Sequence, residues 1–326
     1  MKKNFLLFIG LFLMFLSCSK EKPSEIDYFY KHFVGNIFDK DKKMQIFMNL
    51  IKKKDKVFGN YFYQKDGKNI EIEGKFLKDG TFLLNEKNGN FKFKITGKKI
   101  TGFWKNKTTK LDFEALENYE NSEELEAFFH NEKNINLEIF YLASKNSNIS
   151  DILLKNFFGE NFIKNKIEEN LKKYAENYKK AFKGIDTNVF KTYEHSIISE
   201  VIFNEKNILV IGNSFSDYSG GAHGSHASNY YVYDLKLNKI LKLKDIFKEN
   251  FENRLSKLLT EKLRKKLKVN SLTEASYFKD EIQAIENFFI TKNGITFVYN
   301  AYEIAPYSVG ETKVFLNFKN LQNIKK

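Results

Sequence analysis

The sequence predicts an all-β, small barrel-like meander followed by an α+β domain built from an antiparallel sheet and two main helices. Two observations predict this fold class. Up to Leu116, short runs of alternating apolar residues are separated by Asp-Gly and Asn-Gly pairs, which is typical of tight β-hairpins. After about residue 136, strand-like runs alternate with two stretches whose apolar residues recur at helical spacing. With 326 residues, 42% of them hydrophobic, the chain is long enough for two packed domains and a leader.

The first segment has the pattern of a bacterial secretion signal. Lys2 and Lys3 precede an apolar run over 5–16, which is shorter than the roughly 20 residues of a membrane-spanning helix. The run ends in LSCS at 16–19, which resembles the lipobox of bacterial lipoproteins, although Phe15 stands where that motif usually has leucine. The resemblance implies acylation of Cys18, for example with palmitate. Ordinary cleavage with loss of Cys18 is the alternative. We expect a signal peptide at 1–17, a polar tether at 18–30, and a protein that crosses the cytoplasmic membrane and stays lipid-anchored in the cell envelope.

Composition excludes several classes of function. Cys18 is the single cysteine, so the folded part can hold neither a disulfide framework nor a cysteine-based zinc site nor a cysteine nucleophile. The net charge of +13 suggests a nucleic-acid partner, but only Arg254 and Arg264 of the 54 basic residues are arginines. Because base readout relies on arginine forks, we expect no nucleic-acid partner. We expect no cofactor either.

Residues 31–116 are predicted to form a meander of about eight short strands. Alternating apolar positions mark several of them, including Met44, Ile46, Met48, Leu50, Ile70 and Ile72. The pairs Asp66-Gly67, Asp79-Gly80 and Asn88-Gly89 supply the positive φ values of tight turns. The meander is expected to be closed or nearly closed, because open strand edges invite aggregation. The module resembles one found in secreted lipoproteins, which implies a fold and no activity.

An acidic connector at 117–135 is expected to be a short helix that joins this module to the α+β domain at 136–326. In that domain, strands are predicted at 136–143, 192–203, 207–218, 229–233, 294–300 and 313–318. Ile167, Leu171, Tyr174 and Tyr178 recur at helical spacing, with Gly184 as a stop signal. A second amphipathic helix is predicted at 251–267.

Four ordered motifs carry a family resemblance over about 136–320. They are YSGGAHG at 218–224, YDL at 233–235, ILKLKDIF at 240–247 and YEIAPYSVG at 302–310. The region resembles the extracytoplasmic domain shared by RsiV-type lysozyme-sensing anti-sigma factors and the non-catalytic N-terminal part of PdaC-type peptidoglycan deacetylases. The resemblance implies an α+β fold and, from the RsiV side, lysozyme as a partner. No anti-sigma segment and no deacetylase domain is recognised, so we expect neither sigma-factor sequestration nor deacetylation.

Two of these motifs supply the candidate partner-binding residues. Gly220 and Gly221 allow the loop after Tyr218 to turn tightly and present His223. Tyr302 to Tyr307, stiffened by Pro306, forms a rigid corner after a strand, and a purely structural turn is the alternative. The hypothesis requires that these two distant segments meet side by side.

Other chemistry remains open for the same histidines. His223 and His226 could hold zinc with Asp217 or His195, although a histidine hydrogen-bonded within the loop is the simpler interpretation. A small hydrolase could use His223 with Asp217 or Asp234. A third hypothesis is that the protein is a structural scaffold of the cell envelope, whose β module docks another lipoprotein.

Acidic residues outnumber basic ones around both motifs. Residues 194–234 contain five acids and one lysine, and residues 274–311 contain six acids and two lysines. Together they could form an acidic face that attracts a cationic enzyme such as lysozyme, or the acids could simply be scattered over the sheet. We expect a non-enzymatic lipoprotein that acts as a decoy, inhibitor or sensor by binding lysozyme, another cell-wall-acting protein, or peptidoglycan.

Overall fold

The computed structural model of the chain describes residues 27–40, 42–182 and 192–326. The predicted signal peptide, Cys18, most of the tether and Gly184 lie outside the described residues. Within them, no helix is both long enough and apolar enough to cross a bilayer. The fold class is confirmed: an eight-stranded antiparallel barrel precedes a mixed sheet with helices.

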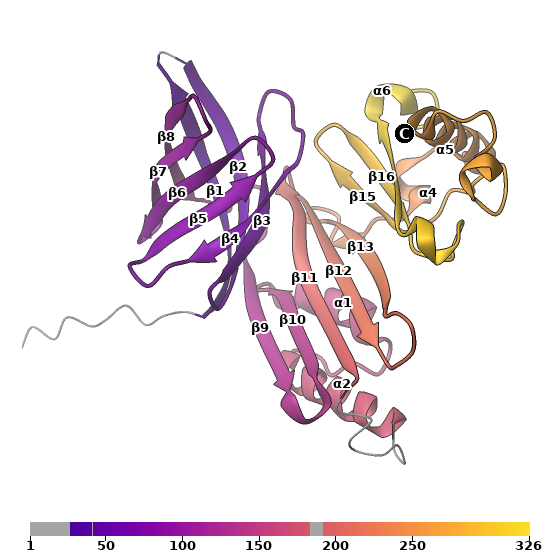
Figure 1. Cartoon of the computed structure of the whole chain (residues 1–326), viewed down its shortest axis with the longest axis horizontal. Helices are drawn as coiled ribbons and strands as arrows, with labels where there is room; N and C mark the ends of the chain where they lie inside the picture. The colour runs from indigo at the N-terminus through magenta and orange to yellow at the C-terminus, as the bar shows by residue number, and fades with distance from the viewer. Residues whose placement is uncertain (1–26, 41, 183–191) are drawn as a thin grey trace, which may run out of the picture.

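The barrel closes between its first and last strands (Figure 1). Its strands are β1 (Tyr28–Asp39), β2 (Lys42–Lys53), β3 (Lys56–Tyr63), β4 (Ile70–Phe76), β5 (Thr81–Glu86), β6 (Gly89–Thr96), β7 (Lys99–Lys105) and β8 (Lys110–Glu117). Alternation places one face of every strand inside, where aromatic rings fill the interior. Tyr61 and Phe113 both meet Phe91 edge to face, with ring centroids 5.2 and 5.1 Å apart.

Two of the three predicted hairpin turns use glycine at positive φ. Gly67 has φ 59° and Gly80 has φ 81°. Gly89 is needed for a different reason, because a Cβ there would lie 2.6 Å from the ring of Trp104. Trp104 is half-buried against the barrel core and donates a hydrogen bond to Glu86.

The second part is a six-stranded sheet in the order β14-β13-β12-β11-β10-β9. Its strands are β9 (Leu125–Glu132), β10 (Leu137–Ser144), β11 (Glu194–Glu205), β12 (Ile208–Tyr218), β13 (Ser225–Asp234) and β14 (Lys239–Ile240). One pair, β10 with β11, is parallel. Parallel neighbours require a long crossover, and helices α1 (Ser147–Phe158) and α2 (Ile167–Ala181) lie within this connection (Figure 1).

The acidic connector is not a helix, which corrects the prediction. After a short irregular stretch it forms β9, which pairs antiparallel with β10 over eight residues. Leu125, Ala127 and Phe129 alternate along this strand and pack into one core cluster, while Phe128 packs into another. Both faces of β9 are therefore used, and this burial together with the pairing outweighs the local helix preference of the glutamates.

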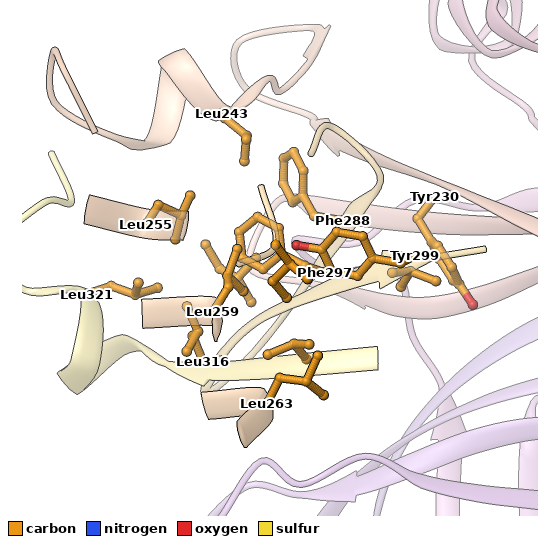
Figure 2. Close-up of a cluster of buried hydrophobic side chains, with 14 of the residues drawn as sticks. Tyr230, Leu243, Leu255, Leu259, Leu263, Phe288, Phe297, Tyr299, Leu316 and Leu321 are labelled. Carbon is orange, nitrogen blue, oxygen red and sulfur yellow. The ribbon is translucent and has the colours of Figure 1, made fainter. Parts of the chain in front are cut away.

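The C-terminal part adds a three-stranded sheet and short helices. Its elements are α4 (Leu243–Ile246), α5 (Glu252–Leu267), β15 (Phe288–Thr291), β16 (Gly294–Tyr299), β17 (Thr312–Asn317) and α6 (Phe318–Leu321). Figure 2 shows Leu255, Leu259 and Leu263 of α5 pointing at Phe297 and Leu316 of the sheet. The predicted helix at 251–267 is confirmed, and its apolar stripe covers one face of this sheet.

The barrel is joined to the six-stranded sheet by aromatic stacking and by buried polar side chains. Phe62 stacks on Phe203 at 5.5 Å, and Tyr28 stacks on Phe129 at 4.7 Å. Between these contacts lies the junction network, a set of hydrogen-bonded side chains from both parts: Tyr30, His32, Asn49, Asn60, Asn204 and Glu205. Satisfied buried polar groups of this kind fix the geometry of a junction.

Candidate binding surface

The loop between β12 and β13 presents His223. Gly220 and Gly221 have φ 91° and 97°, and the Tyr218 hydroxyl donates to the Gly221 carbonyl at 3.2 Å. A Cβ at Gly224 would lie 2.8 Å from the carbonyl oxygen of Asp217. Glycine is therefore required where the loop turns and where it returns to β13.

The corner after β16 presents two tyrosines. Tyr302 has φ 69°, a left-handed conformation that costs a residue with a Cβ about 1–2 kcal/mol. Its side chain is 60% exposed. Pro306 starts the 3-10 helix Tyr307–Val309, and Ala305 beside it is buried. The corner is thus anchored in the core through Ala305, while the Tyr302 side chain faces solvent.

The loop and the corner meet, as the hypothesis requires. The rings of His223 and Tyr307 are stacked with centroids 4.1 Å apart and planes 16° apart. Tyr302 lies 5.7 Å from Tyr307, ring to ring. We call His223, Tyr307 and Tyr302 the aromatic ladder. The Tyr307 hydroxyl donates to the Gly224 carbonyl at 2.6 Å, which fastens the corner to the loop.

Asparagine side chains hold the corner on the edge of β13. Asn300 accepts a hydrogen bond from the Ser228 backbone N–H at 2.8 Å, and Asn287 donates to the Ser228 carbonyl at 2.8 Å. Asn287 also accepts from the Tyr230 N–H at 3.0 Å. These bonds occupy backbone groups that a further strand would otherwise take, so the ladder sits on a rigid support.

The ladder offers ring faces and one histidine to solvent. Exposed aromatic rings on a rigid base suit either a protein partner, where they act as anchors, or a sugar ring that stacks on them. His223 Nδ1 donates to the Gly224 carbonyl at 3.0 Å, so its Nε2 is the ring atom left for a ligand. Gly220 and Gly221 shape the loop without contributing a side chain.

The acids counted around the two motifs do not all gather beside the ladder: Glu194, Asp217 and Glu303 lie at the loop and the corner, but others lie elsewhere. Glu205 belongs to the junction network at the opposite end of β11, where it contacts His32. Asp234 accepts hydrogen bonds in the turn after β13, again at the far end of that strand from the loop. Among the acids of 274–311, Asp280 pairs with Arg264 and Glu311 pairs with Lys313. Only part of the counted acidic charge is therefore near the ladder.

Neither carboxylate proposed for a hydrolase bonds His223. Asp217 accepts from His195 Nδ1 at 3.0 Å, and Asp234 lies at the other end of β13. His226 is exposed on β13, opposite Ser216. Within 27–40, 42–182 and 192–326, no group of three His, Cys, Asp or Glu side chains is arranged to hold a metal.

His195 is instead the centre of a cluster that the sequence did not reveal. Its Nε2 contacts the Tyr174 hydroxyl at 2.9 Å, and its ring stacks on Tyr178 at 4.6 Å. Burial raises the pKa of Tyr178 to about 12, and Asp217 reinforces the increase. Since neither phenol is activated, the cluster joins α2 to β11 and β12 as packing. The helical spacing of the two tyrosines was visible in the sequence, but their histidine partner was not.

Glu200 makes the stability of the fold depend on pH. It lies opposite Gly212 in the β11–β12 pair, and burial raises its pKa to about 7, opposed by Lys313 and reinforced by Glu71 and Glu311. A glutamate whose folded pKa exceeds the unfolded 4.5 contributes stability below pH 4.5 that is lost as the pH rises towards 7. The full effect is on the order of 2–3 kcal/mol.

Glu200→Gln should therefore be more stable than the parent at pH 8, by about 2 kcal/mol, because the amide stays neutral. At pH 5 the difference should shrink towards zero. Urea unfolding of both proteins at the two pH values measures this. An equal difference at both pH values would contradict the assignment.

The C-terminal part matches a known family model. Residues 244–319, which begin in α4 and end in α6, match the family described as "Protein of unknown function (DUF3298)". This region of the chain is therefore similar to DUF3298 domains, and it includes Tyr302 and Tyr307.

Particular relatives extend the similarity. The chain is 26% identical over 176 residues to the peptidoglycan-N-acetylmuramic acid deacetylase PdaC of Bacillus subtilis, covering 51% of this chain and 37% of that protein. It thus spans little more than a third of the curated relative. The crystal structure of a DUF3298 family member from Bacteroides fragilis is 28% identical, with a TM-score of 0.57, over 64% of this chain and 96% of that one. A second DUF3298 structure, from Pseudomonas aeruginosa, has 18% identity and a TM-score of 0.45 over 62% of this chain and 93% of that one.

Proposed function

We propose that the protein is a non-enzymatic lipoprotein of the bacterial cell envelope, anchored through Cys18, that binds a cell-wall-acting protein with its aromatic ladder. Lysozyme is the first candidate. The observation that carries the proposal is the contact between two segments about 80 residues apart in sequence, in which His223 stacks on Tyr307 and Tyr307 bonds Gly224.

The chemistry of the ladder favours binding. Tyr302 is exposed and Tyr307 is half-buried, and both are held on a fixed backbone, so their rings lose little entropy when a partner covers them. Tyrosine is also enriched among binding hot spots. The left-handed Tyr302 supports the same conclusion, because backbone strain that the surrounding structure maintains is frequent at ligand-binding sites. The similarity to PdaC, which is named for its action on peptidoglycan, favours a cell-wall setting. Peptidoglycan itself is therefore the alternative ligand.

Calorimetric titration of lysozyme into the chain lacking residues 1–18 tests the proposal. We expect saturable heat at micromolar concentrations, unchanged in Leu237→Ala. Leu237 is a matched control, since it is 62% exposed in the turn after β13, far from the ladder. At about 0.3 mM lysozyme, even binding with a Kd of 1 mM would occupy part of the protein. If no heat is detected up to that concentration, lysozyme is not the partner. Soluble muropeptides in the same assay test the glycan alternative.

The alternative hypotheses, a hydrolase and an envelope scaffold, predict results that differ from those of the binding proposal. A hydrolase would release products from muropeptides, whereas we expect none, because Asp217 is engaged by His195. A scaffold would cross-link to one stoichiometric envelope neighbour without added lysozyme. The binding proposal predicts that cross-linking at Tyr302 depends on the added partner.

A further inference from the structure

A cavity lies where the open end of the barrel faces the C-terminal sheet. Its volume is about 940 Å³, within the range of small-ligand sites, and barrel residues of β1, β2 and the β3–β4 turn line it together with Lys292. Lys292 comes from the turn between β15 and β16, a hairpin that extends towards the barrel (Figure 1). Asn293 in the same turn donates a hydrogen bond to the Asp66 carbonyl. Both parts of the protein are needed to form this cavity.

Three lysines are among the residues that line the cavity: Lys43, Lys65 and Lys292. In the part of the chain that the structure describes, none of the three is in a salt bridge or a side-chain hydrogen bond. Lys292 is held in place, because its aliphatic stem lies so close to Gly67 that a Cβ there would approach it to 2.6 Å. Burial lowers the pKa of Lys292 and the nearby Lys206 lowers it further, while Asp66 and Glu205 oppose the change. The charged residues of the lining are these three lysines and Asp66, so basic side chains outnumber acidic ones there.

The rest of the lining is suited to hydroxyl groups. Asn36, Gln45 and Gln64 each offer an amide that can donate and accept, and Tyr63 adds a ring and a hydroxyl. Asp66 supplies a carboxylate that can accept a hydrogen bond from a sugar hydroxyl. The lining contains no arginine, the residue that best matches the geometry of phosphate.

We propose that this cavity binds a saccharide that carries a carboxylate, with Lys292 and its neighbouring lysines on the acid group and the amides on the ring hydroxyls. The site is separate from the aromatic ladder. Lys292 and Tyr302 lie beyond opposite ends of β16, whose six residues span about 20 Å. The inference goes beyond the proposed function and does not depend on it.

Trigalacturonic acid is a suitable probe, because it places a carboxylate on each sugar ring. We expect calorimetry on the chain lacking residues 1–18 to show binding that weakens with added salt. Lys292→Gln should weaken it at least about tenfold, the loss expected for one charge-assisted hydrogen bond. Lys98→Gln should bind as the parent does, since the β6–β7 turn lies at the opposite end of the barrel. Circular dichroism checks that both variants fold.

Two further ligands decide what is recognised. Neutral tri-N-acetylchitotriose should bind at least about tenfold more weakly than the acidic trisaccharide, because it leaves the lysines unpaired. Inorganic tripolyphosphate that binds as tightly as trigalacturonic acid would overturn the proposal in favour of a phosphate site. Absence of trigalacturonic acid binding, or equal binding by Lys292→Gln, would also overturn it. Tyr302→Ala should leave this binding unchanged, so failure here is distinct from failure of the lysozyme proposal.

Discussion

His32→Ala is expected to destabilise the protein by about 2–4 kcal/mol, because it removes a fully buried ring and leaves a buried hydrogen-bond acceptor without its partner. His32 is fully buried, and its Nε2 lies 2.8 Å from a carboxylate oxygen of Glu205, 173 residues away. Its Nδ1 lies 2.9 Å from the Asn49 side-chain oxygen. The Asn49 oxygen is an acceptor, so Nδ1 of His32 donates to it, while the Asn49 amide nitrogen donates to Asn60. Removal of the ring leaves the Glu205 carboxylate without this partner, whereas the Asn49 oxygen still accepts from the Tyr30 hydroxyl.

Trp104 provides the measurement. It is the only tryptophan and lies in the barrel, so its fluorescence follows barrel unfolding, while far-ultraviolet circular dichroism follows the whole chain. We expect the two urea transitions to coincide in the parent and to separate in His32→Ala, since the junction no longer couples the parts.

Lys53→Gln is the matched control for the junction. Lys53 pairs with Glu138 across the same junction, but at a partly exposed position. Its loss should cost less than about 1 kcal/mol. If His32→Ala costs no more than Lys53→Gln, the junction network does not stabilise the docking.

Tyr307→Ala is expected to weaken lysozyme binding about 100-fold, which corresponds to about 2.7 kcal/mol at a hot spot. The ring is the middle member of the ladder, so its removal takes away the stacking surface of both His223 and Tyr302. The same change removes the hydrogen bond to Gly224 that fastens the loop. Titration calorimetry with lysozyme measures the effect.

Tyr307→Phe separates these two contributions. It keeps the stacked ring and loses only the hydroxyl, so binding should weaken by less than about tenfold. Leu237→Ala should have no effect. If Tyr307→Ala binds lysozyme as tightly as the parent does, the binding surface lies elsewhere on the protein.

Much of the fold could be predicted because its signals are local. Alternation along β2 and β4 and the glycines at 67 and 80 belong to neighbouring residues, so they can be recognised without knowledge of the rest of the chain. The apolar stripe of α5 is also a local signal, because its leucines recur at helical spacing within one segment. The connector was misassigned because its glutamates fit a helix locally, whereas pairing with β10 is decided by a strand that follows it in the chain.

The candidate surface was predicted in part. The motifs at 218–224 and 302–310 drew attention to both segments, and the structure brings His223 onto Tyr307. The predicted acidic face holds for only part of the counted acids, because counting charges along a strand ignores where its two ends lie. Glu205 and Asp217 are on neighbouring strands but near opposite ends of the sheet, so they serve different contacts.

The sequence by itself determined the class of each part: the barrel, the strands and helices of the α+β region, and the glycine loop that carries His223. Only the tertiary structure decided the partners: Glu205 for His32, His195 for Asp217, and the barrel mouth for Lys292. The physical reason is that strand and helix patterns repeat every few residues, whereas buried polar pairing depends on which surfaces dock. Which surfaces dock depends on the packing energy of the whole chain, and no repeating pattern in the sequence reports it.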